Sequence, residues 1–441
     1  MKQLEKAPLA ELVLSVKKYG INGEGIGYYN KKPVFIPGAF ANEWARVAIM
    51  VDHGRYYSGR LLEITKANNA RKKTFYPQLL SCGYPFLSLK YGAQLKAKRE
   101  LLCESLERYA QVDSKLVKQV IPSEFELGYR NQCKVPFGMQ DNQLVSGLFE
   151  EKTGVFVPVQ DDPIHKLELE TVRKQVLRVL NQFKLKAYDT KSKRGLRTLI
   201  LRSTSNLVQL SIIASEPLKP EVAMALGKIP GICGLSVCVN KDPDGSLLTD
   251  KTKLLIPENK VELKLDRYRF LLSPTSFFQL NTYQAKALYR YVRDLVPVGV
   301  KTIVEAYCGI GTLSHYLAKK AECVIGIDAN QEAIADAKAA AIKNQVEALS
   351  FVASDSAAGF KEITKKVDLL VVDPPRSGLD GAMIAAIHHK KPRYLIYVSC
   401  NPSTLAKNIA DLSEYQILSL QPFDMFPQTP LVECVALMVL K

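Results

Sequence analysis

Residues 302–312 read TIVEAYCGIGT, an apolar run that leads directly into a turn with two glycines. The run is typical of a buried strand, and the turn is typical of the passage from a strand to a helix. A second apolar run, residues 323–327, ends at Asp328. Gly309 and Gly311 would let the backbone approach a ligand closely, and the Asp328 carboxylate would accept hydrogen bonds from both ribose hydroxyls. The segment therefore predicts a site for an adenosine-containing ligand, although the turn alone also fits a simple connection.

Helical and strand-like patterns alternate from residue 273 to residue 441. The expected helices are residues 284–295, 313–321 and 331–344, and the expected later strands are residues 349–352, 369–372 and 394–398. Alternation of this kind builds a parallel, doubly wound sheet with its ligands at the carboxyl ends of the strands. We therefore predict the α/β class, with a Rossmann-like domain over residues 273–441.

The residues around the turn narrow the choice of cofactor. A dinucleotide-binding fingerprint has a third glycine, but Ser314 stands at that position. This difference favours S-adenosylmethionine over NAD. Asp355 follows the strand at residues 349–352 and is placed to approach an adenine edge, or alternatively to cap the next helix.

Three reactive side chains follow the later strands. Asp373 begins an Asp-Pro-Pro-Arg turn, Cys400 ends the apolar run at residues 394–398 with an intervening serine, and Glu433 lies further downstream. A thiol between two carboxylates supplies a nucleophile, an acid that orients the substrate and a proton acceptor. The alternative is a buried cysteine that acts as a small hydrophobe. The three residues together favour covalent chemistry on a pyrimidine.

The residue after the two prolines restricts that chemistry further. Amino-group methyltransferases carry an aromatic residue there, whereas this chain has Arg376. Carbon methylation remains, and C5 of uracil is too poor a nucleophile to attack a methyl donor unaided. Addition of the Cys400 thiolate to C6 would turn C5 into an enolate carbon, and Glu433 would then remove the C5 proton.

The N-terminal half predicts two further modules. Short strand-like runs between turn residues favour an OB-like β-barrel over residues 1–63, followed by a polar linker at residues 64–73 and a central α+β module over residues 74–272. RNA contacts are expected on the barrel, and the basic stretch at residues 184–202 fits either an RNA contact or a solvated loop. The barrel candidates, which are alternatively ordinary strand residues, are Tyr28, Tyr29, Lys31, Lys32, Arg55, Tyr56 and Tyr57.

The composition indicates the partner and the compartment. A formal net charge of +16 favours a polyanionic partner, and we expect RNA rather than DNA or a membrane. The nine cysteines are scattered without a repeated Cys-x-x-Cys spacing, so free thiols and no metal site are expected. The first residues lack the apolar core of a signal peptide, which favours a cytoplasmic protein. We expect a monomer.

The motifs resemble those of the RNA 5-methyluridine (uracil-C5) methyltransferases. They occur in that family's order, at residues 276–281 (SFFQLN), 307–311 (YCGIG), 373–376 (DPPR), 399–405 (SCNPSTL) and 432–433 (VE). The resemblance implies an N-terminal barrel of the TRAM type that holds RNA, Cys400 as nucleophile and Glu433 as base. It also implies that Gln279, Tyr307, Asp328 and Asp373 lie at the cofactor or beside it, with Thr312 and Asp355 as further candidates.

Two positions depart from the family's pattern. Many ribosomal members bind a four-iron cluster through four cysteines, but the aligned positions here are Tyr76, Cys82, Pro85 and Asp162, so we predict no iron–sulfur cluster. Leu431 replaces a histidine that relatives often carry before Val-Glu. The resemblance favours 23S rRNA as the substrate, because the transfer-RNA branch of the family commonly lacks the barrel. The target uridine is expected to be unpaired, because a base flips out at least cost in a loop or bulge. The alternatives are uridine 54 of tRNA, a cytosine-C5 methyltransferase and a catalytically silent RNA-binding assembly factor.

Overall fold

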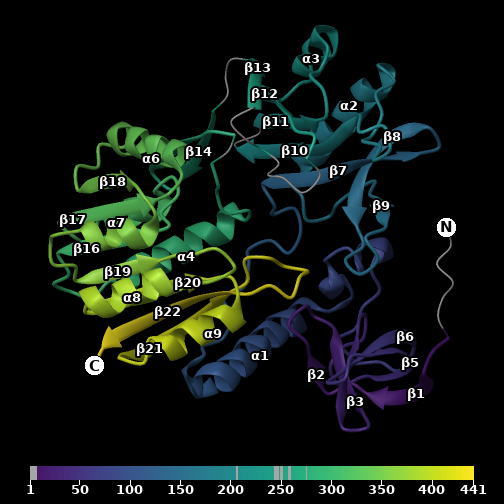
Figure 1. Cartoon of the computed structure of the whole chain (residues 1–441), viewed down its shortest axis with the longest axis horizontal. Helices are drawn as coiled ribbons and strands as arrows, with labels where there is room; N and C mark the ends of the chain where they lie inside the picture. The colour runs from purple at the N-terminus through teal and green to yellow at the C-terminus, as the bar shows by residue number, and fades with distance from the viewer. Residues whose placement is uncertain (1–6, 205–206, 243–247, 249–251, 257–259, 275) are drawn as a thin grey trace.

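The computed structural model describes residues 7–204, 207–242, 248, 252–256, 260–274 and 276–441. Three sheets dominate it (Figure 1). An N-terminal barrel lies below a central sheet, and the C-terminal sheet lies beside both, with helix α1 (Tyr91–Ala110) crossing between the C-terminal sheet and the barrel. Among the described residues, no helix is both long and apolar enough to span a membrane.

The barrel is a six-stranded sheet in the order β1-β5-β6-β4-β3-β2. Its strands are β1 (Ala10–Ser15), β2 (Lys18–Tyr19), β3 (Gly25–Tyr29), β4 (Lys32–Ile36), β5 (Trp44–Asp52) and β6 (Tyr57–Lys66). Alternate residues of β5 fill the core, because successive side chains of a strand point to opposite faces. Tyr57, which we expected on the RNA-binding surface, lies in this core at 8% exposure.

The segment after the barrel differs from the expected free linker. Strand β6 continues to Lys66, beyond the predicted boundary at residue 63. Arg71 then returns to the barrel, where its Nε donates to Glu43 Oε1 at 2.7 Å. Glu43 is fully buried, and a buried carboxylate requires a charged or hydrogen-bonding partner. Part of the polar segment at residues 64–73 is therefore structural, which its composition did not reveal.

The central sheet has the order β13-β12-β11-β10-β7-β8-β9. Its strands are β7 (Gln132–Gln140), β8 (Gln143–Phe149), β9 (Phe156–Pro158), β10 (Leu196–Thr204), β11 (Leu207–Ala214), β12 (Ile232–Val239) and β13 (Thr252–Ile256). Helices α2 (Leu167–Gln182) and α3 (Pro220–Gly227) pack against it around one apolar core. Asp141 and Asn142 both have positive φ, 49° and 62°, as the tight turn between β7 and β8 requires.

The C-terminal sheet has the order β18-β17-β16-β19-β20-β22-β21. Its strands are β16 (Thr302–Ala306), β17 (Cys323–Asp328), β18 (Leu349–Ala353), β19 (Leu369–Val372), β20 (Tyr394–Ser399), β21 (Tyr415–Phe423) and β22 (Glu433–Leu440). The first five are parallel, and β22 runs antiparallel between β20 and β21. Adjacent residues such as Ile303 and Val304 belong to different cores, so both faces of the sheet are buried. The predicted α/β class is confirmed.

Helices cover both faces of this sheet (Figure 1). They are α4 (Thr282–Leu295), α5 (Thr312–Leu317), α6 (Gln331–Lys343), α7 (Ser356–Glu362), α8 (Gly381–Lys390) and α9 (Pro402–Asp411). Helix α5 ends at Leu317, four residues earlier than predicted, since the apolar spacing continues into a turn. Three short 3-10 helices lie before and after α1, at Pro77–Leu79, Pro85–Ser88 and Ser114–Leu116.

Two elements that we expected in the central module pack with the C-terminal sheet. Leu102 and Leu106 of α1 share a core with β16, β19 and β20. The hairpin β14 (Val261–Leu265) and β15 (Tyr268–Leu272) contributes to the core on the opposite face. Both elements bury their apolar residues against the faces of the C-terminal sheet. Their position along the chain does not predict which sheet they pack against. The boundary at residue 273 therefore lies too late for the C-terminal core.

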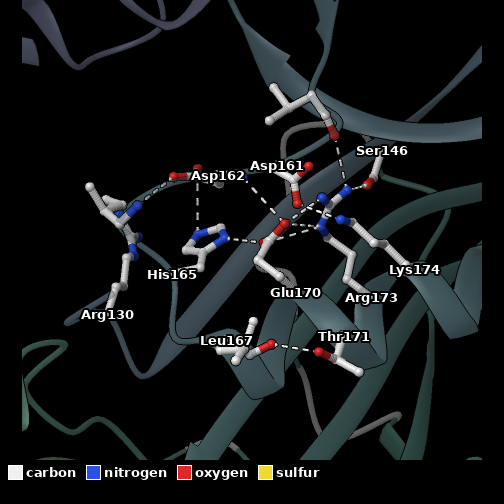
Figure 2. A network of polar contacts seen from close by, with 12 residues as sticks. Arg130, Ser146, Asp161, Asp162, His165, Leu167, Glu170, Thr171, Arg173 and Lys174 are labelled. Atoms are coloured by element: carbon white, nitrogen blue, oxygen red, sulfur yellow. Dashed lines mark hydrogen bonds and ion pairs between the residues drawn. The ribbon is translucent and has the colours of Figure 1, made fainter. Parts of the chain in front are cut away.

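A buried polar network holds α2 to the loop that precedes it (Figure 2). Arg173 forms an ion pair with Glu170 and donates to Ser146 Oγ at 2.7 Å, while His165 Nδ1 lies 2.8 Å from Glu170 Oε1. Burial alone would raise the pKa of Glu170, but hydrogen bonds from His165 and Arg173 and the charge on Arg173 lower this pKa to about 2. The Glu170 carboxylate is therefore held charged inside the protein.

Arg173→Met should destabilise the central part by about 3–5 kcal/mol, because it leaves the Glu170 charge buried without its main partner. Lys174→Met is the matched control, since Lys174 pairs with Asp161 with nearly half of each side chain exposed. A surface pair of this kind contributes about 0–1 kcal/mol. Urea denaturation of the two variants measures both effects, and equal effects would contradict the role assigned to the network.

Candidate active site

The reactive residues lie together because of how the strands of the C-terminal sheet end. Asp373 directly follows β19 and Cys400 directly follows β20, so both stand at the carboxyl edge of parallel strands. Strand β22 runs the opposite way, and its register pairs Ser399 with Cys434. Glu433, the first residue of β22, therefore lies at the edge of the sheet where β20 ends and Cys400 follows. Proximity of Glu433 to Cys400 depends on this antiparallel strand.

Asp373 and Cys400 are more exposed to solvent than the strands that precede them. The residues of β19 and β20 are almost wholly buried, whereas Asp373 and Cys400 are each partly exposed. Tyr307 and Asp328, at the ends of β16 and β17, are likewise partly exposed. The edge therefore presents a row of polar side chains that a ligand can reach.

Burial and neighbouring negative charges raise the pKa values of the acidic groups at this edge. The pKa of Cys400 is raised to about 12, first by burial and then by the charges on Glu433 and Asp373, against the opposing charge on Arg376. Burial likewise raises the pKa of Glu433 well above its ordinary value, and the charge on Asp373 adds to this rise. The pKa of Asp373 is also raised by burial, against a hydrogen bond from Gln279. Without a substrate, the site keeps its thiol protonated.

The cysteine loop and the Asp-Pro-Pro-Arg loop are tied to each other. Asn401 Nδ2 donates to the Arg376 carbonyl at 3.0 Å, and Asn401 Oδ1 accepts from Ser403 N at 3.1 Å as the N-cap of α9. One side chain thus fixes the start of the helix after Cys400 and the position of the arginine loop. Our sequence analysis assigned no role to Asn401, although its place directly before a proline at the first turn of a helix is a capping signal.

The segment that carries Gln279 is held by the central sheet. Arg202 of β10 donates to the carbonyls of Ser273 and Ser276 at 2.9 and 2.7 Å, and Asn131 Nδ2 donates to the Gln279 carbonyl at 2.9 Å. Arg202 is only 6% exposed, so it does not follow an RNA backbone as the basic stretch suggested. The central sheet therefore helps to shape the C-terminal site.

The backbone of the turn after β16 leaves room for a ligand to approach it closely. Tyr307 has φ 64°, a left-handed conformation that is uncommon for a non-glycine residue, and Gly309 has φ 54° with open space where a side chain would stand. Gly311 differs, because a Cβ there would lie 2.6 Å from the Phe351 ring. Asp328 Oδ2 accepts from Gly309 N at 2.8 Å. Gly309 thus faces open space, whereas Gly311 has a φ of 71° and also lacks room for a side chain.

Two predicted cofactor residues make internal contacts. Thr312 Oγ1 donates to Tyr289 Oη at 3.2 Å, and Asp355 Oδ1 accepts from Ala357 N and Ala358 N as the N-cap of α7. The capping alternative for Asp355 is thus present in the structure, and Asp355 remains exposed beside the edge. A carboxylate has about four lone-pair sites, so this bond leaves acceptor capacity. Their roles at a cofactor remain predictions.

Glu305 is a site residue that our sequence analysis missed. It is 2% exposed within β16, its carboxylate accepts from Ser314 Oγ, and burial raises its pKa to about 8, with the charges of Asp373 and Asp328 adding to the rise. A carboxylate inside an otherwise apolar strand, directly before the glycine turn, was the available signal. Because its pKa responds to Asp373 and Asp328, Glu305 belongs to the same electrostatic cluster.

The residues at the cluster positions of iron-binding relatives do not fit an iron–sulfur cluster. Of Tyr76, Cys82, Pro85 and Asp162, only Cys82 supplies a thiolate, and Asp162 instead accepts from Tyr84 Oη at 3.0 Å. Within the described residues, no group of three or more histidine, cysteine, aspartate or glutamate side chains is arranged to hold a metal ion. The absence of a cluster remains a prediction for the isolated protein.

The strand order and the glycine turn define a class I, S-adenosylmethionine-dependent methyltransferase. The sequence model of the tRNA (uracil-5-)-methyltransferase family matches residues 90–441. The chain therefore belongs to this family of RNA uracil-C5 methyltransferases.

Relatives and a solved structure support this membership. An uncharacterised RNA methyltransferase of Listeria monocytogenes is 35% identical over 444 residues, covering 97% of each chain. One of Fusobacterium nucleatum is 31% identical, covering 96% of this chain and 94% of its own. The tRNA (uracil-54, C5)-methyltransferase of Pyrococcus abyssi, solved with S-adenosyl-L-homocysteine, is 26% identical with a TM-score of 0.77, covering 97% of this chain and 99% of that chain.

Alkylation of Cys400 by iodoacetamide should rise about tenfold per pH unit from pH 8 to 10 in the folded enzyme, because only the thiolate reacts and its pKa is raised to about 12. In urea-denatured protein, the same cysteine should level off above pH 9, since an ordinary thiol has a pKa of about 8.5. Mass spectrometry of the Cys400 peptide measures both rates. A plateau below pH 9 in the folded enzyme would contradict the raised pKa.

Proposed function

We propose that this enzyme methylates C5 of an unpaired uridine in 23S rRNA through a covalent bond between Cys400 and C6 of the base. The observation that carries this proposal is the meeting of Cys400, Asp373 and Glu433 at one edge of the sheet, beside the glycine turn. The formal net charge of +16 suits a polyanionic substrate.

Each residue has one task in the reaction. The Cys400 thiol loses its proton to solvent, the resulting thiolate bonds to C6, and the electrons of the C5–C6 double bond move toward O4 to give an enolate. S-adenosylmethionine, when bound, supplies an electrophilic methyl group for C5. The ionised Glu433 carboxylate then accepts the C5 proton, the double bond re-forms, and the thiolate leaves with its electron pair. Asp373, hydrogen-bonded by Gln279, orients the uracil ring from the other loop.

The raised pKa values suit this sequence of steps. A carboxyl group buried like Glu433 becomes a stronger proton acceptor than an exposed one, as removal of a carbon-bound proton requires. The raised pKa of Cys400 keeps this thiol a weak nucleophile in the free enzyme, which protects it from side reactions. Tyr307, Gly309 and Asp328 would hold the cofactor at the neighbouring strand ends. The further candidates are Gln279, Gly311, Thr312, Asp355 and Asp373.

Uridine 54 of tRNA is the second candidate target. The Pyrococcus abyssi enzyme acts on that uridine, and its alignment covers 97% of this chain, so most of the barrel is shared. The barrel therefore does not separate ribosomal from transfer RNA, contrary to our expectation from the sequence. The formal net charge of +16 suits either RNA, and we keep 23S rRNA as the preferred substrate.

Purified enzyme, incubated with labelled methyl donor and separate 23S rRNA and tRNA transcripts, should place label in 5-methyluridine of the 23S rRNA, and Cys400→Ala should place none. Digestion to nucleosides and mass spectrometry identify the product and the modified fragment. Label confined to tRNA would move the enzyme to the second candidate. Label in 5-methylcytidine, or RNA binding without any methylation, would overturn the proposal in favour of a cytosine methyltransferase or a silent assembly factor.

A further inference from the structure

The loop that precedes Glu433 is held by parts of the chain far away in sequence. Residues 424–432 connect β21 to β22 and extend from the C-terminal sheet toward α1 and the central part (Figure 1). Tyr129 Oη donates to the Pro427 carbonyl at 3.0 Å, and Gln94 of α1 exchanges hydrogen bonds of 2.9 Å with Gln428. Asn281 Nδ2, beside Gln279, donates to the Met425 carbonyl at 3.3 Å. This loop is therefore fixed from several sides.

Its strongest anchor is an ion pair between Lys98 of α1 and Asp424. Both side chains are 0% exposed, and Lys98 Nζ also donates to the Phe426 carbonyl at 2.9 Å. An ammonium group without water is costly unless it is paired and hydrogen-bonded, and a pair of apolar residues is often equally stable in such a place. Stability alone therefore does not explain why this pair is charged. Its geometry favours a role in fixing the loop.

The register of β21 and β22 connects this anchor to the proposed base. Phe423 is the direct partner of Glu433 across the two strands, and Asp424 follows Phe423 immediately. The Asp424 backbone N–H donates to the Ile121 carbonyl at 2.9 Å, which fixes the same residue from a third side. A shift of Asp424 would therefore displace the strand end at which Glu433 stands.

We propose that Lys98 is a positioning residue whose buried ion pair with Asp424 holds Glu433 where it can take the C5 proton. This inference rests on the proposed function, because it assumes that Glu433 is the base. It assigns helix α1, which touches no proposed reacting atom, to the last step of the reaction. Proton removal, rather than thiolate attack or methyl transfer, should then depend on Lys98.

The test uses the intermediate that precedes proton removal. If the base is absent or displaced, the methyl group is transferred but Cys400 cannot leave, so enzyme stays bonded to methylated RNA. Glu433→Gln is the positive control and should accumulate this adduct. The test variant combines Lys98→Met with Asp424→Leu, which leaves no unpaired charge. Its adduct should exceed that of wild type about tenfold, with turnover reduced about tenfold, since small displacements of a reacting group are costly.

Two further variants separate positioning from general damage. Lys98→Gln with Asp424→Asn keeps a hydrogen-bonding pair of similar size and should return adduct and turnover most of the way to wild type. Lys96→Met, on the same helix, removes an exposed pair with Glu100 and should behave as wild type. Adduct is measured as methyl label that migrates with protein–RNA complex in a denaturing gel, and the KM for the methyl donor should stay unchanged.

The outcomes distinguish the two levels of the proposal. If Glu433→Gln itself accumulates no adduct, Glu433 is not the base and the proposed function fails at that residue. If Glu433→Gln accumulates adduct but the Lys98→Met, Asp424→Leu protein turns over normally, the proposed function stands and the positioning role is wrong. A third outcome is that the same protein turns over slowly, accumulates no adduct and recovers activity only at lower temperature. That result would also overturn the positioning role, in favour of a purely structural one.

Discussion

Four acidic groups lie close together at the carboxyl edge of the C-terminal sheet, and the repulsion between their negative charges constrains the whole site. Glu433 and Glu305 are buried, and the charge on Asp373 raises the pKa of both. The charges on Glu433 and Asp373 also raise the pKa of Cys400. These four groups cannot all be ionised at the same time, because burial and like charges disfavour their charged forms. The pKa values of all four groups are therefore raised, and each group's negative charge disfavours ionisation of its neighbours.

The fold brings these groups together through one antiparallel strand. The parallel strands β16 to β20 deliver Glu305, Asp373 and Cys400 by their order alone, but Glu433 reaches the same edge only because β22 is inserted between β20 and β21. An inserted strand needs a connecting loop that leaves the sheet and returns. That loop is where α1 and the segment beside Gln279 meet. The separate parts of the chain are thus joined at the residue that comes last in the proposed reaction.

Local patterns predicted much of the catalytic domain. The strands at residues 302–306, 323–328 and 394–399, the glycine turn, and the positions of Asp373 and Cys400 follow from apolar runs and from residues directly after them. What local patterns could not predict depends on distant contacts. The buried partners Lys98 and Asp424, the return of Arg71 to Glu43, and the packing of β14 and β15 under the C-terminal sheet carry no signal within their own segments. The sequence likewise does not reveal the Phe351 ring that leaves no room for a side chain at Gly311.

The central claim is that the sulfur of Cys400 bonds to C6 of the target uracil, and a mechanism-based trap measures it most directly. Target RNA with 5-fluorouridine at the modified position carries fluorine where Glu433 would remove a proton, and fluorine cannot leave as a cation, so the bond to the enzyme should persist after methyl transfer. We predict a stable protein–RNA species whose digestion yields the modified nucleotide on the Cys400 peptide. Absence of that species under conditions that methylate the unfluorinated RNA, or attachment at a different cysteine, would contradict the covalent mechanism.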